Sequence, residues 1–256
     1  SKVIISEVNK DFSYKIYIVK KARLYTDTIN DTAVIHDQKV IKGPSFQIRN
    51  TNFSAIENNI VFEKGTPRLQ KKLSGKVLSL LSGGAGNYNY WHWLFDILPR
   101  IKIIANKIDL NEIDYFLLPD NSRRFQKDTL SLLNIPKKKQ LSSQNYRHIK
   151  TDEIIASDHP YVINNDASSA ITNIPQWIID WLKKEFTKDL NLRDINFPEK
   201  IYIDRGDASP NISKLRLIVN EREVKDKLLE HKYKVIKLSD YSIIDQIKLF
   251  FNAKKM

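Results

Sequence analysis

The stretch Gly83–Arg100, with the sequence GGAGNYNYWHWLFDILPR, is the most informative part of this chain. It follows an apolar run, Lys76–Ser82, that predicts a buried strand. The glycines predict a turn, and Asn89 is a favourable residue to begin an amphipathic helix. In this strand–loop–helix order the loop lies at the carboxyl end of a strand, where open α/β sheets bind their ligands.

His92 and Asp96 are four residues apart, so a helix directs both side chains to one face. Two ionisable groups near a helix N-terminus and a glycine loop are suited to proton transfer. Each also has a structural interpretation, His92 as a hydrogen-bonded core histidine and Asp96 as the partner of Arg100 one turn later. Spacing alone favours the structural interpretation. Pro99 predicts a kink or the end of the first helical segment.

Composition limits the classes of protein. The chain has 256 residues, 41% hydrophobic and 28% charged, which fits a globular protein of one large or two modest domains. Its net charge of +12 indicates an anionic partner, such as nucleic acid, a phosphorylated molecule or a membrane surface, unless the lysines only reflect gene composition. Without cysteine, there are no disulfides, thiolate metal ligands or cysteine nucleophile. No run approaches the ~20 apolar residues of a membrane span.

The patterns divide the chain into three parts. Residues 1–165 are predicted as one α/β domain, β-rich over 1–75 and Rossmann-like over 76–165, where strands alternate with helices. Residues 166–198 are predicted as a linker with an interdomain helix, and residues 199–256 begin a second α/β domain. Strands are expected at Lys15–Val19, Ala33–Ile35, Lys39–Ile41, Ser45–Ile48, Asn59–Phe62, Asp114–Leu118, Tyr146–Ile149, Glu153–Ala156, Lys200–Ile203 and Lys234–Leu238, and further helices at Ser122–Leu133, Gln176–Phe186, Asn220–His231 and Asp245–Lys255.

The residues Asn89–Arg100 resemble the N-Y-x-H-W-L-x-D-x-L-P-R pattern of family 61 glycosyltransferases, which include bacterial capsular-polysaccharide enzymes. Later segments resemble the family in the same order, and together they cover roughly residues 76–256. These segments are Phe116–Pro119, Phe125–Leu130, Ile203–Arg205, Arg216–Val224 and Gln246–Phe250.

The resemblance implies a GT-B-like fold, with two Rossmann-like domains and a cleft between them. Family members continue past the last helix into a strand and an H-G-A-x-L-x-N loop. The second domain is therefore expected to be incomplete here, and the chain to be a fragment of a longer enzyme; whether the fragment is active by itself stays open. Leu217 also departs from the pattern, because many members have arginine there.

The resemblance also implies roles for individual residues. Inverting transfer needs a base that takes the acceptor proton and positive charge that stabilises the departing diphosphate. GT-B enzymes usually supply this charge without a metal, so no metal is expected here. Asp96 is favoured as the base with His92 orienting it, and the reverse assignment stays open. The expected donor-binding residues are Arg205, Arg216, Asn220 and Glu221, although the two last also suit a helix start. The expected acceptor-side residues are Gly84, Gly86, Asn89, Trp93 and Arg100.

The predicted function is transfer of a sugar from a nucleotide sugar, such as a UDP-sugar, to a glycan or lipid-linked acceptor in surface polysaccharide synthesis. The alternative is a non-catalytic remnant that binds glycan or a partner enzyme. Nucleic-acid binding ranks last, because only the net charge favours it. The expected location is cytoplasmic, with peripheral association at the inner membrane face. His148, His159 and His231 are assigned structural roles, with His159-Pro160 near the interdomain region.

Overall fold

The structure is a computed structural model that describes residues 1–26, 31–45, 48–49, 52–53, 55–81, 89–162, 167–193, 196–206 and 218–256. These residues form two compact units. The first comprises Ser1–Leu130 and Asn134–Lys183, and the second comprises Ser131–Leu133 and Lys184–Met256. Both units combine helices with strands, which confirms the predicted α/β class. The predicted domain limits at residues 165 and 198 stay predictions.

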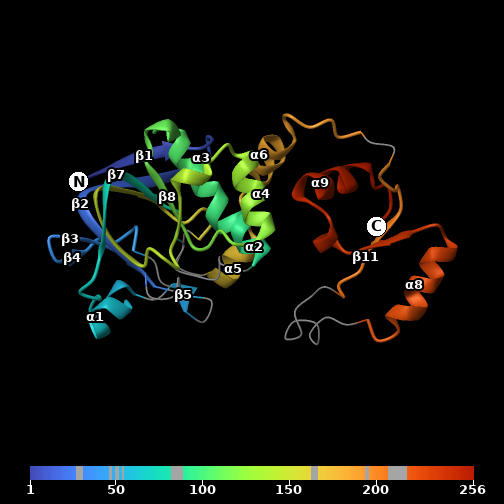
Figure 1. Cartoon of the computed structure of the whole chain (residues 1–256), viewed down its shortest axis with the longest axis horizontal. Coiled ribbons are helices and arrows are strands. Elements are labelled where there is room, and N and C mark those ends of the chain that lie inside the picture. The colour runs from blue at the N-terminus through green and yellow to red at the C-terminus, as the bar shows by residue number, and fades with distance from the viewer. Residues whose placement is uncertain are drawn as a thin grey trace. The chain divides into compact units, whose positions relative to one another are not determined.

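The first unit contains a mixed sheet, which has eight strands within the described residues (Figure 1). Its order is β4-β3-β2-β10-β7-β8-β9, and β1 also pairs with β2. Strands β10, β7, β8 and β9 are parallel, whereas β2 runs antiparallel to its neighbours β10, β1 and β3. The strands are β1 (Lys2–Glu7), β2 (Ser13–Thr26), β3 (Thr32–His36), β4 (Lys39–Val40), β7 (Lys71–Ser79), β8 (Tyr115–Leu118), β9 (Gln140–Ser142) and β10 (His148–Ser157), with a separate pair β5 (Ile48–Arg49) and β6 (Asn52–Phe53).

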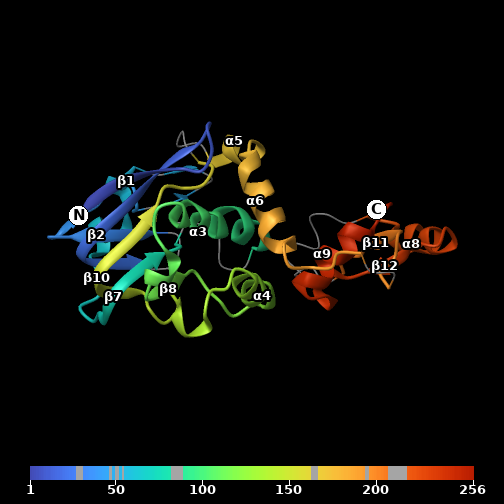
Figure 2. The same cartoon turned by 90° about the horizontal axis from the view of Figure 1, so that it is seen from above.

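Helical segments connect β7 to β8 and β8 to β9, and α3 lies along the sheet beside β1 and β10 (Figures 1 and 2). The Ser6 hydroxyl in β1 donates to the Ile103 carbonyl in α3 at 2.7 Å. No helix of the described residues has the length and apolar character to cross a bilayer. The helical segments are η1 (Ile56–Asn58), α1 (Ile60–Lys64), α2 (Tyr90–His92), η2 (Trp93–Ile97), α3 (Leu98–Ala105), η3 (Leu110–Glu112), α4 (Arg124–Leu132), η4 (Lys137–Lys139), α5 (Ala167–Thr172) and α6 (Gln176–Thr187).

The central strands β7 and β10 are buried on both faces toward their carboxyl ends, as is usual for parallel sheets. Val77 of β7 belongs to an apolar cluster with Leu24, Leu117 and Ile154. The next residue, Leu78, is also completely buried and points to the opposite face, because side chains alternate along a strand. Packing on both faces fixes the carboxyl ends of β7 and β10, and the segments that follow these strands begin there.

The predicted strand at Asn59–Phe62 is wrong, because this segment begins helix α1. The Asn59 side chain accepts a hydrogen bond from the Val61 N–H at 3.2 Å, and Gly65 ends the helix with a φ of 68°. Of the helix residues only Ile60 is buried. A short apolar run does not separate helix from strand, and here the asparagine cap decides the outcome.

Other boundaries also differ from the prediction. The first part of the predicted linker, residues 166–198, contains helix α5, which contacts β6, so tertiary packing overrides a polar composition typical of loops. The two strands expected at Tyr146–Ile149 and Glu153–Ala156 form one strand, β10. The strand expected at Ser45–Ile48 lies largely outside the described residues.

The second unit contains the predicted β–α–β arrangement. Its parallel strands pair Ile201 with Lys234 and Ile203 with Ile236, and helix α8 lies between them in sequence. The small core consists of Ile201, Ile236 and Leu249. The elements are β11 (Ile201–Ile203), α8 (Glu221–Glu230), β12 (Lys234–Ile236), η5 (Leu238–Asp240) and α9 (Ile243–Asn252).

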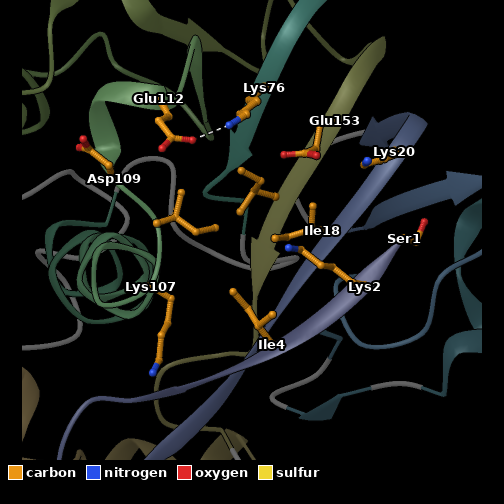
Figure 3. A pocket seen from close by; sticks show the side chains of 12 residues that line it. Ser1, Lys2, Ile4, Ile18, Lys20, Lys76, Lys107, Asp109, Glu112 and Glu153 are labelled. Carbon is orange, nitrogen blue, oxygen red and sulfur yellow. Dashed lines mark hydrogen bonds and ion pairs between the residues drawn. The ribbon is translucent and has the colours of Figure 1, made fainter.

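An open cleft of about 480 Å³ lies on the first unit, between the strands and the segment that follows α3 (Figure 3). Isoleucines line part of it together with lysines and carboxylates, and Lys76 is paired to Glu112 at 2.6 Å. Its remaining lining residues are Ser1, Lys2, Ile4, Ile18, Lys20, Lys107, Ile108, Asp109, Glu153 and Ile155.

Replacement of Gly75 in β7 tests how closely the neighbouring segments pack around this strand. It has a φ of 99°, its N–H donates to Asp152 at 2.7 Å, and an added Cβ would collide with the Asp114 carboxylate. We expect Gly75→Ala to lower the free energy of unfolding by about 3 kcal/mol, from backbone strain and overpacking together. Denaturant unfolding measures this loss.

Gly65→Ala is the matched control, because Gly65 also has a positive φ but no atom within 4 Å of an added Cβ. Only the backbone strain remains there, about 1–3 kcal/mol at a φ of 68° and a ψ of −157°, so the loss should be smaller than in Gly75→Ala. Equal losses in the two variants would contradict the role assigned to the Asp114 contact.

Candidate active site

The ends of two neighbouring parallel strands, β7 and β10, define the candidate site. From β7 the chain moves on to β8 and β9, whereas β10 lies on the other side of β7. The strand order therefore reverses between β7 and β10. In open α/β sheets, ligands bind beyond the carboxyl ends of strands at such a reversal.

Asn89 begins the helix that follows β7, as predicted. Its side-chain oxygen accepts hydrogen bonds from the backbone N–H groups of Trp91 at 2.9 Å and His92 at 3.4 Å. These bonds satisfy donors that the first helical turn leaves without an intrahelical acceptor. His92 is consequently held in the first turn of the helix.

The next turn is a π-helix, η2, rather than an α-helix. The N–H of Leu98 donates to the carbonyl of Trp93, five residues earlier. Pro99 has no N–H, so the Phe95 carbonyl lacks the donor that an α-helix would supply, which favours the wider turn. The helix then continues as α3 with Pro99 in its first turn. Single π-turns are frequent at functional sites.

Asp96 lies in this π-turn, and its carboxylate joins three side chains. Oδ2 lies 2.9 Å from His92 Nδ1, and Oδ1 accepts a 2.6 Å hydrogen bond from the Tyr161 hydroxyl. The His159 Nε2 atom is 3.9 Å from Oδ2. The side chain of Asp96 is only 2% exposed, whereas that of His92 is 21% exposed. His92 is therefore the member of the pair that solvent and a substrate can reach.

His159 is a buried neutral side chain. Its Nδ1 accepts hydrogen bonds from the N–H groups of Tyr161 at 3.4 Å and Val162 at 3.2 Å. Burial lowers the pKa of His159 to about 3; the charge of Arg100 acts in the same direction, and Asp96 opposes it. With Nδ1 acting as an acceptor, the proton of the neutral ring is on Nε2, the atom that faces Asp96.

Tyr161 is a hydrogen-bond donor that stays protonated. Burial raises the pKa of its hydroxyl, and the charge of Asp96 raises it further. Sequence reasoning missed Tyr161 and assigned His159 only a structural role near the interdomain region. The pairing of β10 beside β7 brings both residues to Asp96, and neither the spacing nor the composition of the chain reveals that pairing.

Arg100 and Trp93 act on the site through buried contacts. The Arg100 guanidinium donates from Nε to the Asp96 carbonyl at 2.9 Å and from Nη1 to the Ser157 carbonyl at 3.2 Å. Burial lowers the pKa of Arg100 to about 10, which leaves it charged at neutral pH. The Trp93 indole N–H donates to the Thr129 hydroxyl at 2.8 Å. Both side chains are completely buried, so neither reaches solvent.

Three predicted site residues, Gly84, Gly86 and Arg216, lie outside the described residues. Arg205 follows β11 and is exposed. Asn220 precedes α8, where its amide donates to Glu223 at 3.2 Å. The structure therefore brings His92 and Asp96 together, and the donor-side residues that it describes belong to the second unit.

Glu221 belongs to a charged cluster that sequence reasoning missed. Its carboxylate accepts from the Tyr202 hydroxyl at 3.0 Å, and Lys225 lies 3.5 Å from it and 3.0 Å from Asp204. Burial opposes ionisation of Asp204, but hydrogen bonds from the Gly206 N–H and Lys225 hold its pKa below the usual value. These contacts give Glu221 a structural role at the start of α8.

Among the described residues no group of three or more histidine, aspartate or glutamate side chains is placed to hold a metal ion. The cleft of Figure 3 includes Lys107, just past the last residue of α3, whereas Asp96 precedes that helix. The eight residues of α3 span about 12 Å, so Lys107 and Asp96 lie near opposite ends of this helix and the cleft is separate from the candidate site.

Burial of neutral His159 predicts a specific acid sensitivity. Its pKa is about 3 in the folded chain against an ordinary 6.5, so the unfolded state binds more protons between these values. The stability contributed by the neutral ring is complete above about pH 6.5 and is lost as the pH falls toward 3. Urea unfolding of His159→Asn between pH 7 and pH 4 is expected to give a shallower loss of unfolding free energy.

Asparagine keeps an oxygen where Nδ1 accepts from Tyr161 and Val162, so the loop retains an acceptor. The exposed His231 provides the control, since His231→Asn should leave the slope unchanged. An unchanged slope in His159→Asn would contradict the assignment of a buried neutral ring.

Comparison with known proteins identifies the family of the chain. The family model described as Glycosyltransferase 61 matches residues 90–256, which include α2, η2, His159 and Tyr161 and the whole second unit from β11 onward. No curated protein matches the chain at a significant level. The matched segment covers more than half of the chain and contains the His92–Asp96 pair. The chain therefore belongs to the glycosyltransferase 61 family.

Proposed function

We propose that this protein transfers a sugar from a nucleotide sugar, such as a UDP-sugar, to a hydroxyl group of a glycan or lipid-linked acceptor in surface polysaccharide synthesis, with inversion at the anomeric carbon. The observation that carries the proposal is the contact of His92 with buried Asp96 inside the segment that matches the family. The net charge of +12 supports an anionic donor and association with the anionic cytoplasmic face of a membrane.

His92 is the general base in this proposal. Its Nδ1 faces the Asp96 carboxylate, so Nδ1 carries a proton and Nε2 has the lone pair that can accept another. The exposure of the His92 side chain, 21% against 2% for Asp96, favours this order over direct proton transfer to Asp96. The sequence favoured the other assignment, with Asp96 as the base, and left His92 open as the alternative base.

Asp96 orients His92 and stabilises the imidazolium ion that forms when Nε2 accepts the proton. The same division of roles operates in catalytic triads, where a buried aspartate holds the histidine tautomer. Tyr161 supports Asp96 by donating to Oδ1, the oxygen that does not contact His92. Both carboxylate oxygens of Asp96 are therefore held in place by neighbouring side chains.

The reaction balances without a metal. As His92 takes the hydroxyl proton, the acceptor oxygen forms a bond to the anomeric carbon and the bond from that carbon to the diphosphate breaks. The negative charge leaves with the nucleoside diphosphate. Arg205 and Arg216 would bind its oxygens, since guanidinium groups stay charged and bind oxyanions with two donors. In this proposal the acceptor binds to the first unit and the donor to the second.

Replacement of His92 tests the base assignment. We expect His92→Ala to reduce transfer by about 10²–10⁴-fold, measured as nucleoside diphosphate released from a panel of UDP-, GDP- and dTDP-sugars with methyl glycosides as acceptors. Added imidazole should restore part of the activity, because it replaces the missing proton acceptor. Full activity in the variant, or no rescue where activity is lost, would remove His92 as the base.

Replacement of Asp96 and Tyr161 separates orientation from proton transfer. Asp96→Asn is expected to lower the transfer rate by about 10³–10⁴-fold, because an amide does not favour the required tautomer of His92. Tyr161→Phe removes one hydrogen bond and should cost about tenfold. Imidazole should rescue neither variant. Rescue of Asp96→Asn by imidazole would count against the division of roles, and His231→Ala serves as the control distant in sequence.

A further inference from the structure

Trp91 differs from the other tryptophans of the chain. All four are among the described residues, and Trp93, Trp177 and Trp181 are buried, whereas Trp91 is partly exposed. Trp177 and Trp93 donate from their indole N–H groups to Tyr14 and Thr129 within the first unit. Core packing therefore accounts for the other three, but not for a partly exposed indole directly before His92.

Three aromatic rings hold the Trp91 indole in place. Its centroid lies 5.0 Å from that of His92 with an interplanar angle of 88°, and 5.0 Å from that of Phe95 at 41°. It lies 5.9 Å from the Tyr161 ring at 75°. These tilted and edge-to-face geometries are favourable for aromatic pairs. The indole is thus fixed before a ligand arrives, so little side-chain entropy is lost on binding.

The position of Trp91 suits recognition of a sugar ring. A pyranose ring carries C–H groups on one face and hydroxyl groups around its edge. The C–H groups pack against the electron-rich face of an aromatic ring, while the hydroxyl groups stay available for hydrogen bonds. A sugar that packs on Trp91 therefore lies beside an imidazole whose centroid is 5.0 Å away, which brings an edge hydroxyl within reach of His92.

We propose that Trp91 is the platform on which the acceptor sugar packs, and that it aligns the attacking hydroxyl with His92. The inference rests on the proposed function for the identity of the acceptor. The neighbouring Tyr90 is also exposed, but its ring packs on Phe125 at 5.0 Å and has no ring contact with His92 among the described residues.

Kinetics on the whole chain provide the first test. Trp91→Ala is expected to raise the KM for the acceptor about tenfold while kcat changes less, because a packing contact of this kind is lost in both ground and transition states. Trp91→Phe, which keeps an aromatic ring, should recover most of the affinity. Tyr90→Ala is the matched control and should leave the acceptor KM unchanged. An unchanged KM in Trp91→Ala would overturn the proposal.

Fluorescence provides a second test that needs no catalysis. As the partly exposed tryptophan, Trp91 should change its emission when methyl β-glucoside, methyl β-galactoside or methyl N-acetyl-β-glucosaminide is added at millimolar concentration. The change should disappear in Trp91→Phe and persist in Tyr90→Ala and His92→Ala. A change that persists in Trp91→Phe, or no change with any of the three glycosides, would overturn the platform.

The two proposals fail in different ways. If His92→Ala keeps full transfer activity but Trp91→Phe loses the fluorescence change, the base assignment is wrong and the platform stands. If His92→Ala loses transfer but Trp91→Ala keeps the wild-type KM and the glycosides leave emission unchanged, the platform is wrong and the base assignment stands.

Discussion

A buried guanidinium joins the two chain segments on which the site depends. Arg100 donates to the carbonyl of Asp96 in the π-turn and to the carbonyl of Ser157, the last residue of β10. A buried cation requires such partners, because an uncompensated charge in the interior costs several kcal/mol. The same requirement fixes geometry: the helix that follows β7 is held against the end of β10, so the residues that follow β10 meet the carboxylate of Asp96.

The chemistry follows from how unequally this cluster is exposed. Asp96 and His159 are buried, and Tyr161 stays protonated. Of the pair His92 and Asp96, only the His92 side chain is accessible to solvent. A buried carboxylate that accepts from Tyr161 and contacts His92 behaves as a fixed negative charge. It stabilises a positive charge on the exposed imidazole, which is the requirement for a base that must accept a proton in the transition state.

Sequence reasoning predicted most elements of the fold because they depend on local patterns. The strand before the glycines, the cap at Asn89 and the β–α–β order of the second unit all follow from periodicity and capping. The errors occurred where local signals are ambiguous. Asn59–Phe62 has too few apolar residues to distinguish a strand from a helix, and the polar segment before Thr172 forms a helix through a contact with β6.

The sequence by itself determined the α/β class, the family and the His92–Asp96 pair, because four-residue spacing and an ordered set of motifs are properties of the linear chain. Only the tertiary structure decided which of the two is buried and which other residues surround them. His159 and Tyr161 are more than sixty positions from Asp96, and they reach it because β10 pairs beside β7. Strand pairing depends on the free energy of the whole sheet, so no local pattern in the chain encodes that contact.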